Sequence, residues 1–342
     1  PHDRDVRSAV DGEIDAARWP DFRHAFARFC GRAAALGYNA ITLDDLAHLA
    51  DASRYPASAR RLLASYRRAF GELFRIAACH GLRVLITTDV MFAHRDGPDV
   101  AGRTLAERTA FLADLLDDLY ASFPGVGGLV VRFGEADGLD VADVFRSTLA
   151  VRTPGEARQV IAALLAVSER HLRTLVVRTW SVGAYRVGDL IWNRDTFDLL
   201  FRGLESPQLI ISLKFGESDF FRFLPLNRHF FRGPQRKIIE LQARREYEGC
   251  GEYPSYIGGD YERYRRELQA GGARLAGIMV WCQTGGWTTF RRLTYVEDSS
   301  VWTEINTHVA LRLFRDGMTA DEAVDDWCRA TGREQVAAQV RP

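Results

Sequence analysis

The sequence is poor in lysine and cysteine, and it carries no net charge. Of its 45 lysine and arginine residues, only Lys214 and Lys237 are lysines. Aspartate and glutamate also number 45, so we expect no overall attraction to nucleic acid or to a membrane surface. The five cysteines form neither a CxxC motif nor a Cys/His cluster, which argues against a disulfide framework or a zinc site. A reducing, cytoplasmic location is therefore expected.

Long apolar runs and nucleotide-binding motifs are also missing. No apolar stretch reaches the roughly 18 residues that a membrane span needs, and no basic segment leads into an apolar one as in a signal peptide. Neither GxGxxG nor GxxxxGK[ST] occurs, although these are the usual nucleotide-binding signatures of open α/β sheets. No HxH pair occurs either, so we expect no metal and no cofactor.

What the sequence does contain is an alternation of strand-like and helix-like segments. Apolar runs predict strands at residues 39–45, 82–90, 127–135, 173–180, 208–216, 237–242 and 276–283. Amphipathic segments predict helices between them, at 19–37, 58–81, 105–123, 154–171 and 260–272. A weaker run at 4–10 is the candidate for an eighth strand, and residues from about 300 to 335 are expected to form a helical C-terminal segment.

Regular alternation of strands and helices requires a parallel sheet covered by helices. Eight such units predict an α/β fold of the (β/α)8 TIM-barrel type, spanning 1–342 as a single domain. An open, doubly wound sheet remains the alternative. In a TIM barrel the catalytic groups sit at the carboxyl ends of the strands, so these positions are the candidates for a site.

Acids, cations and indoles gather at those strand ends. They are Asp44, Asp45, Asp89, Arg132, Glu135, Arg178, Trp180, Lys214, Asp219, Glu246, Glu248, Trp281 and Trp287. Carboxylates without a metal suit glycoside hydrolysis, in which one acid protonates the leaving oxygen while another carboxylate activates water or attacks the sugar. Indole rings suit the apolar faces of sugars, so the pattern favours an enzyme that acts on carbohydrate.

Cations from three neighbouring strands suggest an acidic sugar. Arg132, Arg178 and Lys214 could together bind an anionic substituent, such as the carboxylate of a uronic acid. Each feature also has a purely structural interpretation. The two arginines could instead pair with the strand-end aspartates inside the barrel, a lone Glu135 could be a solvated turn residue, and a lone Trp281 could be core packing. The prediction therefore depends on the whole constellation.

The segment that spans the strands at 208–216 and 237–242 resembles the α-glucuronidases of glycoside hydrolase family 67. The stretch LIISLKFGESDFFRFLPLNRHFFRGPQRKIIELQARREYEG is similar to the family's run of Lys, Gly, Asp-Phe, a Pro-containing loop, Glu-Leu-Gln and a Glu-Tyr pair. GGLVVRFGEADG, VVRTW, GYNAITLDDL, HGLRVLITTDV and the C-terminal VALRLFRDGMTADEAVDDWCRATG are similar with lower specificity. The resemblance covers most of the chain and implies release of (4-O-methyl)glucuronic acid from xylan fragments.

The resemblance also implies roles for individual residues. Glu135 would be the general acid, and Asp219 and Glu246 would prime the attacking water in an inverting, exo-acting reaction. Arg132, Arg178 and Lys214 would bind the uronate carboxylate. The strand-end pattern adds further residues to the predicted substrate-binding set, namely Trp180, Trp281, Trp287, Asp44 and Asp45.

Two alternatives remain open. One is a retaining glycosidase that uses Glu135 and Glu246, and the other is a non-catalytic barrel that binds acidic glycans. In each case the expected partner is an oligosaccharide bearing a uronic acid, with neither nucleic acid nor membrane involved and the oligomeric state unspecified.

Overall fold

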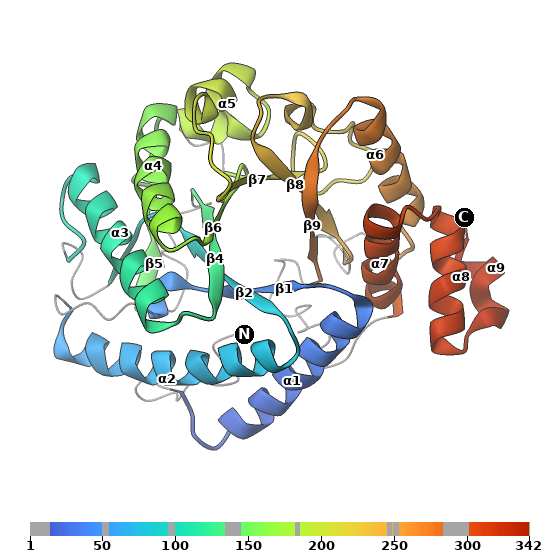
Figure 1. Ribbon diagram of the computed structural model, residues 1–342, viewed down its shortest axis with the longest axis horizontal. Helices are drawn as coiled ribbons and strands as arrows, with labels where there is room; N and C mark the ends of the chain where they lie inside the picture. The colour runs from blue at the N-terminus through green and yellow to red at the C-terminus, as the bar shows by residue number, and fades with distance from the viewer. Residues whose placement is uncertain are drawn as a thin grey trace. The chain divides into compact units, whose positions relative to one another are not determined.

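The structure of the protein is a computed structural model that describes residues 14–49, 55–94, 100–133, 145–181, 185–244, 248, 253–282 and 301–341. Within them, strands and helices alternate along the chain (Figure 1). Seven strands share one sheet in the order β1-β2-β4-β6-β7-β8-β9. They are β1 (Ala40–Asp44), β2 (Arg83–Asp89), β4 (Val126–Arg132), β6 (Thr174–Arg178), β7 (Leu209–Lys214), β8 (Arg236–Gln242) and β9 (Leu275–Trp281).

All seven strand predictions are confirmed, and with them the parallel α/β class. The pairs β1–β2, β2–β4, β4–β6 and β8–β9 are parallel. Six of the seven strands end one to three residues earlier than predicted, the largest difference being at β4, which ends at Arg132; β8 ends at Gln242 as predicted. The candidate eighth strand at 4–10 lies outside the described residues, so closure into an eight-stranded barrel stays a prediction.

The five predicted helices are confirmed, and the C-terminal segment is helical as expected. The helices are α1 (Trp19–Leu36), α2 (Ala57–Cys79), α3 (Leu105–Ser122), α4 (Pro154–Arg170), α5 (Arg194–Phe201), α6 (Gly258–Ala270), α7 (Val301–Leu311), α8 (Ala320–Thr331) and α9 (Ala337–Val340). Capping boxes fix the starts of α3, α4 and α8. In each box a threonine hydroxyl accepts a backbone N–H, and a glutamate three residues later accepts the threonine N–H.

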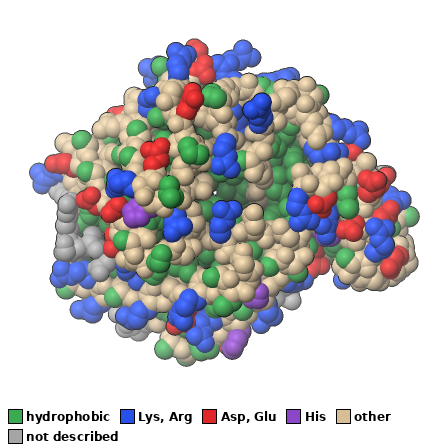
Figure 2. Space-filling view, viewed as in Figure 1, with side chains coloured by type: hydrophobic (Ala, Val, Ile, Leu, Met, Phe, Trp, Pro, Cys, Tyr) green, Lys and Arg blue, Asp and Glu red, His purple; other side chains and the backbone are tan. Residues whose placement is uncertain are grey.

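The chain divides into two compact units, which are described separately below. The first unit comprises residues 1–34, 38–211 and 233–235, and it contains β1, β2, β4 and β6. The second unit comprises residues 35–37, 212–232 and 236–342, and it contains β8 and β9. Strand β7 is shared, since its residues 209–211 belong to the first unit and 212–214 to the second. On the face of the molecule shown in Figure 2, basic and acidic side chains are interspersed, as the zero net charge suggests.

A short antiparallel pair of strands in the first unit was not predicted. It joins β3 (Phe92–His94) to β5 (Phe145–Ser147), with His94 opposite Phe145. Three residues per strand are too few to show an alternating pattern, which explains the omission. The ring of Phe145 lies at the centre of an aromatic cluster, with centroid distances of 5.1 to 6.2 Å to His94, His48, Tyr55 and Phe92.

Glycine is required where β4 runs beside β6. A Cβ atom added to Gly128 would lie 2.2 Å from the carbonyl oxygen of Thr174 on the neighbouring strand. That oxygen belongs to the backbone of a buried ladder and cannot move aside cheaply. By contrast, Gly155 in the first turn of α4 has nothing within 4 Å of the added atom.

We therefore expect Gly128→Ala to lower the free energy of unfolding by roughly 2–3 kcal/mol, because it overpacks the β4–β6 ladder. Gly155→Ala should be neutral, or stabilising by up to about 1 kcal/mol, because alanine is the better helix former. Urea unfolding of both variants measures the difference. Equal stabilities for the two variants would show that the β4–β6 contact is looser than described.

Candidate functional site

The first unit brings acids and a cation together at the ends of β1, β2 and β4. Asp89 lies opposite Arg132 in the parallel register, so both side chains point to one face of the sheet. Arg132 Nε lies 3.0 Å from Asp89 Oδ1, and Arg132 Nη2 lies 3.9 Å from Asp44 Oδ1. The structural interpretation of Arg132, an ion pair with strand-end aspartates, is therefore observed. Its predicted contact with a substrate carboxylate stays a prediction.

Other predicted residues of the first unit have different surroundings. Asp45 caps a short 3-10 helix (Leu46–His48), where its Oδ1 accepts the His48 backbone N–H at 3.2 Å and lies 2.7 Å from His48 Nδ1. Burial, and secondarily the charge of Asp45, raises the pKa of Tyr55 above its ordinary value. Arg178 ends β6 and is buried, while Trp180 two residues later is partly buried.

In the second unit, the decisive feature is a lysine–aspartate pair at the end of β7. Lys214 is the last residue of β7 and its side chain is only 4% exposed. Its Nζ lies 2.5 Å from Asp219 Oδ1 and 4.2 Å from the centroid of the Phe220 ring. The charge of this buried ammonium is thus met by a carboxylate and by an aromatic face.

The loop that follows β7 holds this pair in place. Asp219 Oδ1 also accepts the backbone N–H of Phe220 at 2.8 Å, and the Phe220 ring packs on Phe215, 5.8 Å between centroids. The loop closes on itself, because Asn227 donates its backbone N–H to the Phe215 carbonyl at 2.7 Å. Asp219 is nevertheless reachable from solvent, with 22% of its side chain exposed.

A buried carboxylate on β8, the strand next to β7, is not among the site residues that the sequence predicts. Glu240, in the middle of β8, is fully buried and accepts hydrogen bonds from Ser212 Oγ on β7 at 2.7 Å and from Trp281 Nε1 on β9 at 3.2 Å. The three side chains link three neighbouring strands and fix the orientation of the partly buried Trp281 indole. The signal was present in KIIELQ, because a carboxylate inside an apolar run needs hydrogen-bond donors once it is buried.

Several predicted residues cannot be placed. Glu135, Glu246 and Trp287 lie outside the described residues. Glu248 is described and buried, and its Oε2 lies 3.9 Å from Arg244 Nε. Among the described residues no group of three His, Cys, Asp or Glu side chains could hold a metal ion. In the same part of the chain, no helix is long and apolar enough to cross a membrane.

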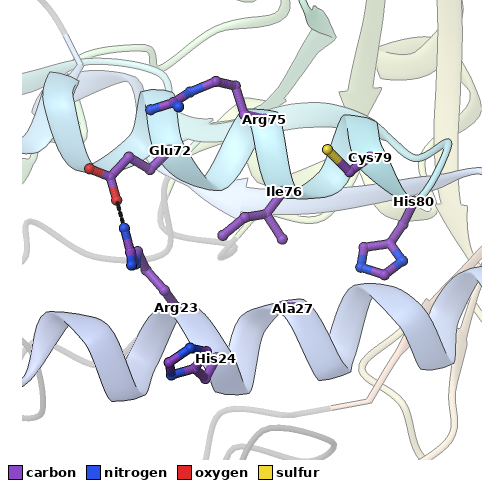
Figure 3. Close-up of a pocket in the computed structure, with 8 residues that line it drawn as sticks. All are labelled: Arg23, His24, Ala27, Glu72, Arg75, Ile76, Cys79 and His80. Atoms are coloured by element: carbon purple, nitrogen blue, oxygen red, sulfur yellow. Dashed lines mark hydrogen bonds and ion pairs between the residues drawn. The ribbon is translucent and has the colours of Figure 1, made fainter.

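A groove between α1 and α2 is a second candidate site (Figure 3). It has a volume of about 510 Å³ and is lined by Arg23, His24, Ala27, Glu72, Arg75, Ile76, Cys79 and His80. Arg23 points across the groove to Glu72, with 2.7 Å between Nη1 and Oε2, and Trp19 Nε1 donates to the same oxygen at 3.0 Å. These bonds hold the pKa of Glu72 below its usual value. None of the predicted site residues lines this groove.

The second lysine has a different environment from the first. Lys237 lies near the start of β8, is buried, and has its pKa lowered from 10.5 to about 8 by burial. The unfolded chain therefore binds more protons than the folded protein between pH 8 and 10.5, so stability rises with pH in that window. Below about pH 8, Lys237 is protonated in both the folded and the unfolded protein. The full free-energy cost of burying its charge then lowers the stability of the fold.

We expect Lys237→Met to be more stable than the wild type at pH 7, by up to about 3 kcal/mol, because the buried charge is removed. This advantage should shrink as pH rises from 8 to 10.5. Denaturant unfolding at several pH values measures it, with Arg236→Met as a control whose effect should not vary over this range, since arginine stays charged. An advantage that is constant with pH would contradict the assignment.

Comparison with known proteins gives a fold but no family. No protein-family model matches the chain, and no curated protein sequence matches it. A solved GH138 enzyme targeting pectin rhamnogalacturonan II matches with a TM-score of 0.58 at 14% identity, over 98% of this chain and 40% of that one. XacCel5A in complex with cellopentaose matches with a TM-score of 0.51 at 12% identity, over 84% of this chain and 90% of that one.

These two matches support the fold of the chain. These two neighbours are glycoside hydrolases, and at such low identities the likeness shows the α/β fold alone. The chain spans well under half the length of the GH138 enzyme. The resemblance to family 67 α-glucuronidases is not shown and stays a prediction.

Proposed function

We propose that the protein is a glycoside hydrolase that releases a uronic acid from oligosaccharides with inversion, in the manner of an α-glucuronidase. The observation that carries the proposal is the Lys214–Asp219 pair. It combines a buried cation suited to a sugar carboxylate with a partly exposed carboxylate suited to water activation. Both lie at the carboxyl end of a strand, where enzymes of the fold keep their catalytic groups.

Lys214 is the proposed anchor for the uronate carboxylate. Its ammonium is compact and carries three hydrogen-bond donors, so it can bind a substrate carboxylate while still donating to Asp219. In a chain that uses arginine almost everywhere else, the lysine at this position indicates a space too small for a guanidinium. Its low exposure strengthens the attraction, because a nearby charge is screened less away from water.

Asp219 is the proposed base for the attacking water. Both of its contacts, from Lys214 Nζ and from the Phe220 N–H, go to Oδ1. Within the described residues Oδ2 has no hydrogen-bond partner, and it can accept a proton from a water molecule. An inverting mechanism needs such a water, because the displacement occurs from the face opposite the leaving group.

The remaining roles follow the resemblance. Glu135 is proposed as the general acid and Glu246 as a second carboxylate that orients the water. Arg132 and Arg178 are proposed to add to the binding of the uronate. The similarity to a GH138 enzyme targeting pectin rhamnogalacturonan II is in keeping with a glycan substrate.

Replacement of Asp219 by asparagine tests the proposal. The amide oxygen can still accept from Lys214 and Phe220, so the loop should keep its shape, but the side chain can no longer take up a proton. We expect kcat for a uronosyl oligosaccharide to fall roughly 10²–10⁴-fold. Tm should also fall, because the buried ammonium of Lys214 loses its charged partner. NMR of the released sugar, followed from the first minutes, reports both the rate and the anomer.

Glu217→Gln is the matched control, because it neutralises a carboxylate in the same loop while keeping an acceptor for the Arg228 N–H. It should leave kcat within a few-fold of the wild type. Near-normal turnover by Asp219→Asn, or first appearance of the anomer with retained configuration, would refute the inverting mechanism and favour the alternative that uses Glu135 and Glu246.

A further inference from the structure

The loop after β7 presents a second surface that the catalytic proposal does not use. Phe220 in this loop is buried, whereas Phe221 and Phe223 are 47% and 78% exposed. The loop also packs against itself near its start. A Cβ on Gly216 would lie 2.7 Å from the Leu224 side chain, so Leu224 packs directly over Gly216. The exposed rings are therefore carried by a folded loop whose base belongs to the candidate site.

The backbone at Phe223 is held in an unfavourable conformation. Its φ angle is 67°, in the left-handed region that bulky side chains rarely adopt. The effect of this conformation is to hold a large aromatic ring out in solvent. Leu172 in the first unit shares both features, with φ of 54° and 77% exposure, but it has no aromatic ring. Strain and exposure alone thus do not distinguish Phe223.

What distinguishes Phe223 is a cation fixed beside its ring. The guanidinium carbon of Arg222 lies 5.1 Å from the centroid of the Phe223 ring. Arg222 Nε is held 3.1 Å from Asp260 Oδ2 at the start of α6. Asp260 also faces a second guanidinium, with Arg263 Nη2 at 3.8 Å from its Oδ1, so one carboxylate is shared by two cations and the patch keeps positive character.

We propose that Arg222, Phe223 and Phe221 form a subsite for the part of an acidic oligosaccharide that continues beyond the uronic acid held by Lys214. The inference rests on the proposed function, because Lys214 and Asp219 in the same loop define where the chain begins. The C–H face of a sugar ring packs on Phe223, as apolar sugar faces do on aromatic side chains. Arg222 donates hydrogen bonds to a hydroxyl or carboxylate of that sugar.

Two substrates of different length test the subsite. Phe223→Ala should lower kcat/KM for a uronosyl oligosaccharide roughly ten-fold, the effect of one lost aromatic contact, and leave that for a methyl uronoside unchanged. Leu172→Ala, the matched control with the same exposure and backbone conformation, should change neither. Equal loss for both substrates, or loss for neither, would overturn the subsite.

A second variant separates binding from folding. Phe223→Gly relieves the left-handed backbone and should not lower Tm, yet it should lose the same activity on the oligosaccharide. If this variant instead keeps wild-type kcat/KM on the oligosaccharide, the ring has no binding role.

The subsite can also be tested if the proposed hydrolysis fails. Should the wild type turn over neither substrate, calorimetry with the same oligosaccharide decides the inference alone. Weaker binding by Phe223→Gly than by the wild type and Leu172→Ala supports the subsite. Equal binding by all three proteins, or no binding by the wild type, overturns it.

Discussion

The ion pair between Lys214 and Asp219 is the interaction on which the candidate site depends. A buried ammonium is expensive unless a carboxylate or an aromatic face meets it, and here both do so within six residues of one strand end. The same pair sets the shape of the loop, because Asp219 also binds the Phe220 N–H and Phe220 packs under the lysine. The position of the proposed base and that of the exposed Phe223 both follow from this arrangement.

Strand-end cations are paired with carboxylates in both units. In the first, Arg132 is drawn to Asp89 and more distantly to Asp44, so much of its charge is already balanced by neighbouring strands. In the second, the carboxylate of Asp219 has one oxygen engaged by Lys214 and Phe220 and keeps solvent access. The proposed chemistry is assigned to Asp219 because it lies beside the buried Lys214 and matches the family 67 pattern. Solvent exposure does not decide the assignment, since Asp89 and Asp44 are 26% and 60% exposed.

The sequence predicted most of what depends on long periodic segments. All seven strands and five of the helices were found from their apolar patterns, and the scarcity of lysine drew attention to Lys214. Short or tertiary features could not be found in this way. The pair β3–β5 has too few residues to show a period, and α5, at eight residues, was missed as well. Arg132 pairs with Asp89 because the strand register places the two residues opposite each other. No local sequence pattern encodes that register.

Glu240 shows a different limit of prediction from sequence. A carboxylate inside the apolar run KIIELQ indicates a buried acid that needs hydrogen-bond donors, but the run as a whole predicts only a strand. Its burial between Ser212 and Trp281 makes it a structural acid that orients an indole at the end of β9. Trp281 is thus anchored in its strand, as a residue of the core would be, and is only partly buried, as a sugar-binding residue would be. The roles of Glu135, Glu246 and Trp287 lie outside the described residues and stay predictions.

Recognition of a sugar carboxylate by Lys214 can be measured by calorimetric binding of glucuronic acid and of glucose to Lys214→Gln. Glutamine can still donate a hydrogen bond to Asp219, so the variant mainly removes the charge. The binding free energy of glucuronic acid should weaken by on the order of 2–5 kcal/mol, while that of glucose should scarcely change. Lys237→Met, which removes the other buried lysine, should affect neither sugar. If Lys214→Gln bound both sugars equally more weakly than the wild type, Lys214 would not be recognising the sugar carboxylate.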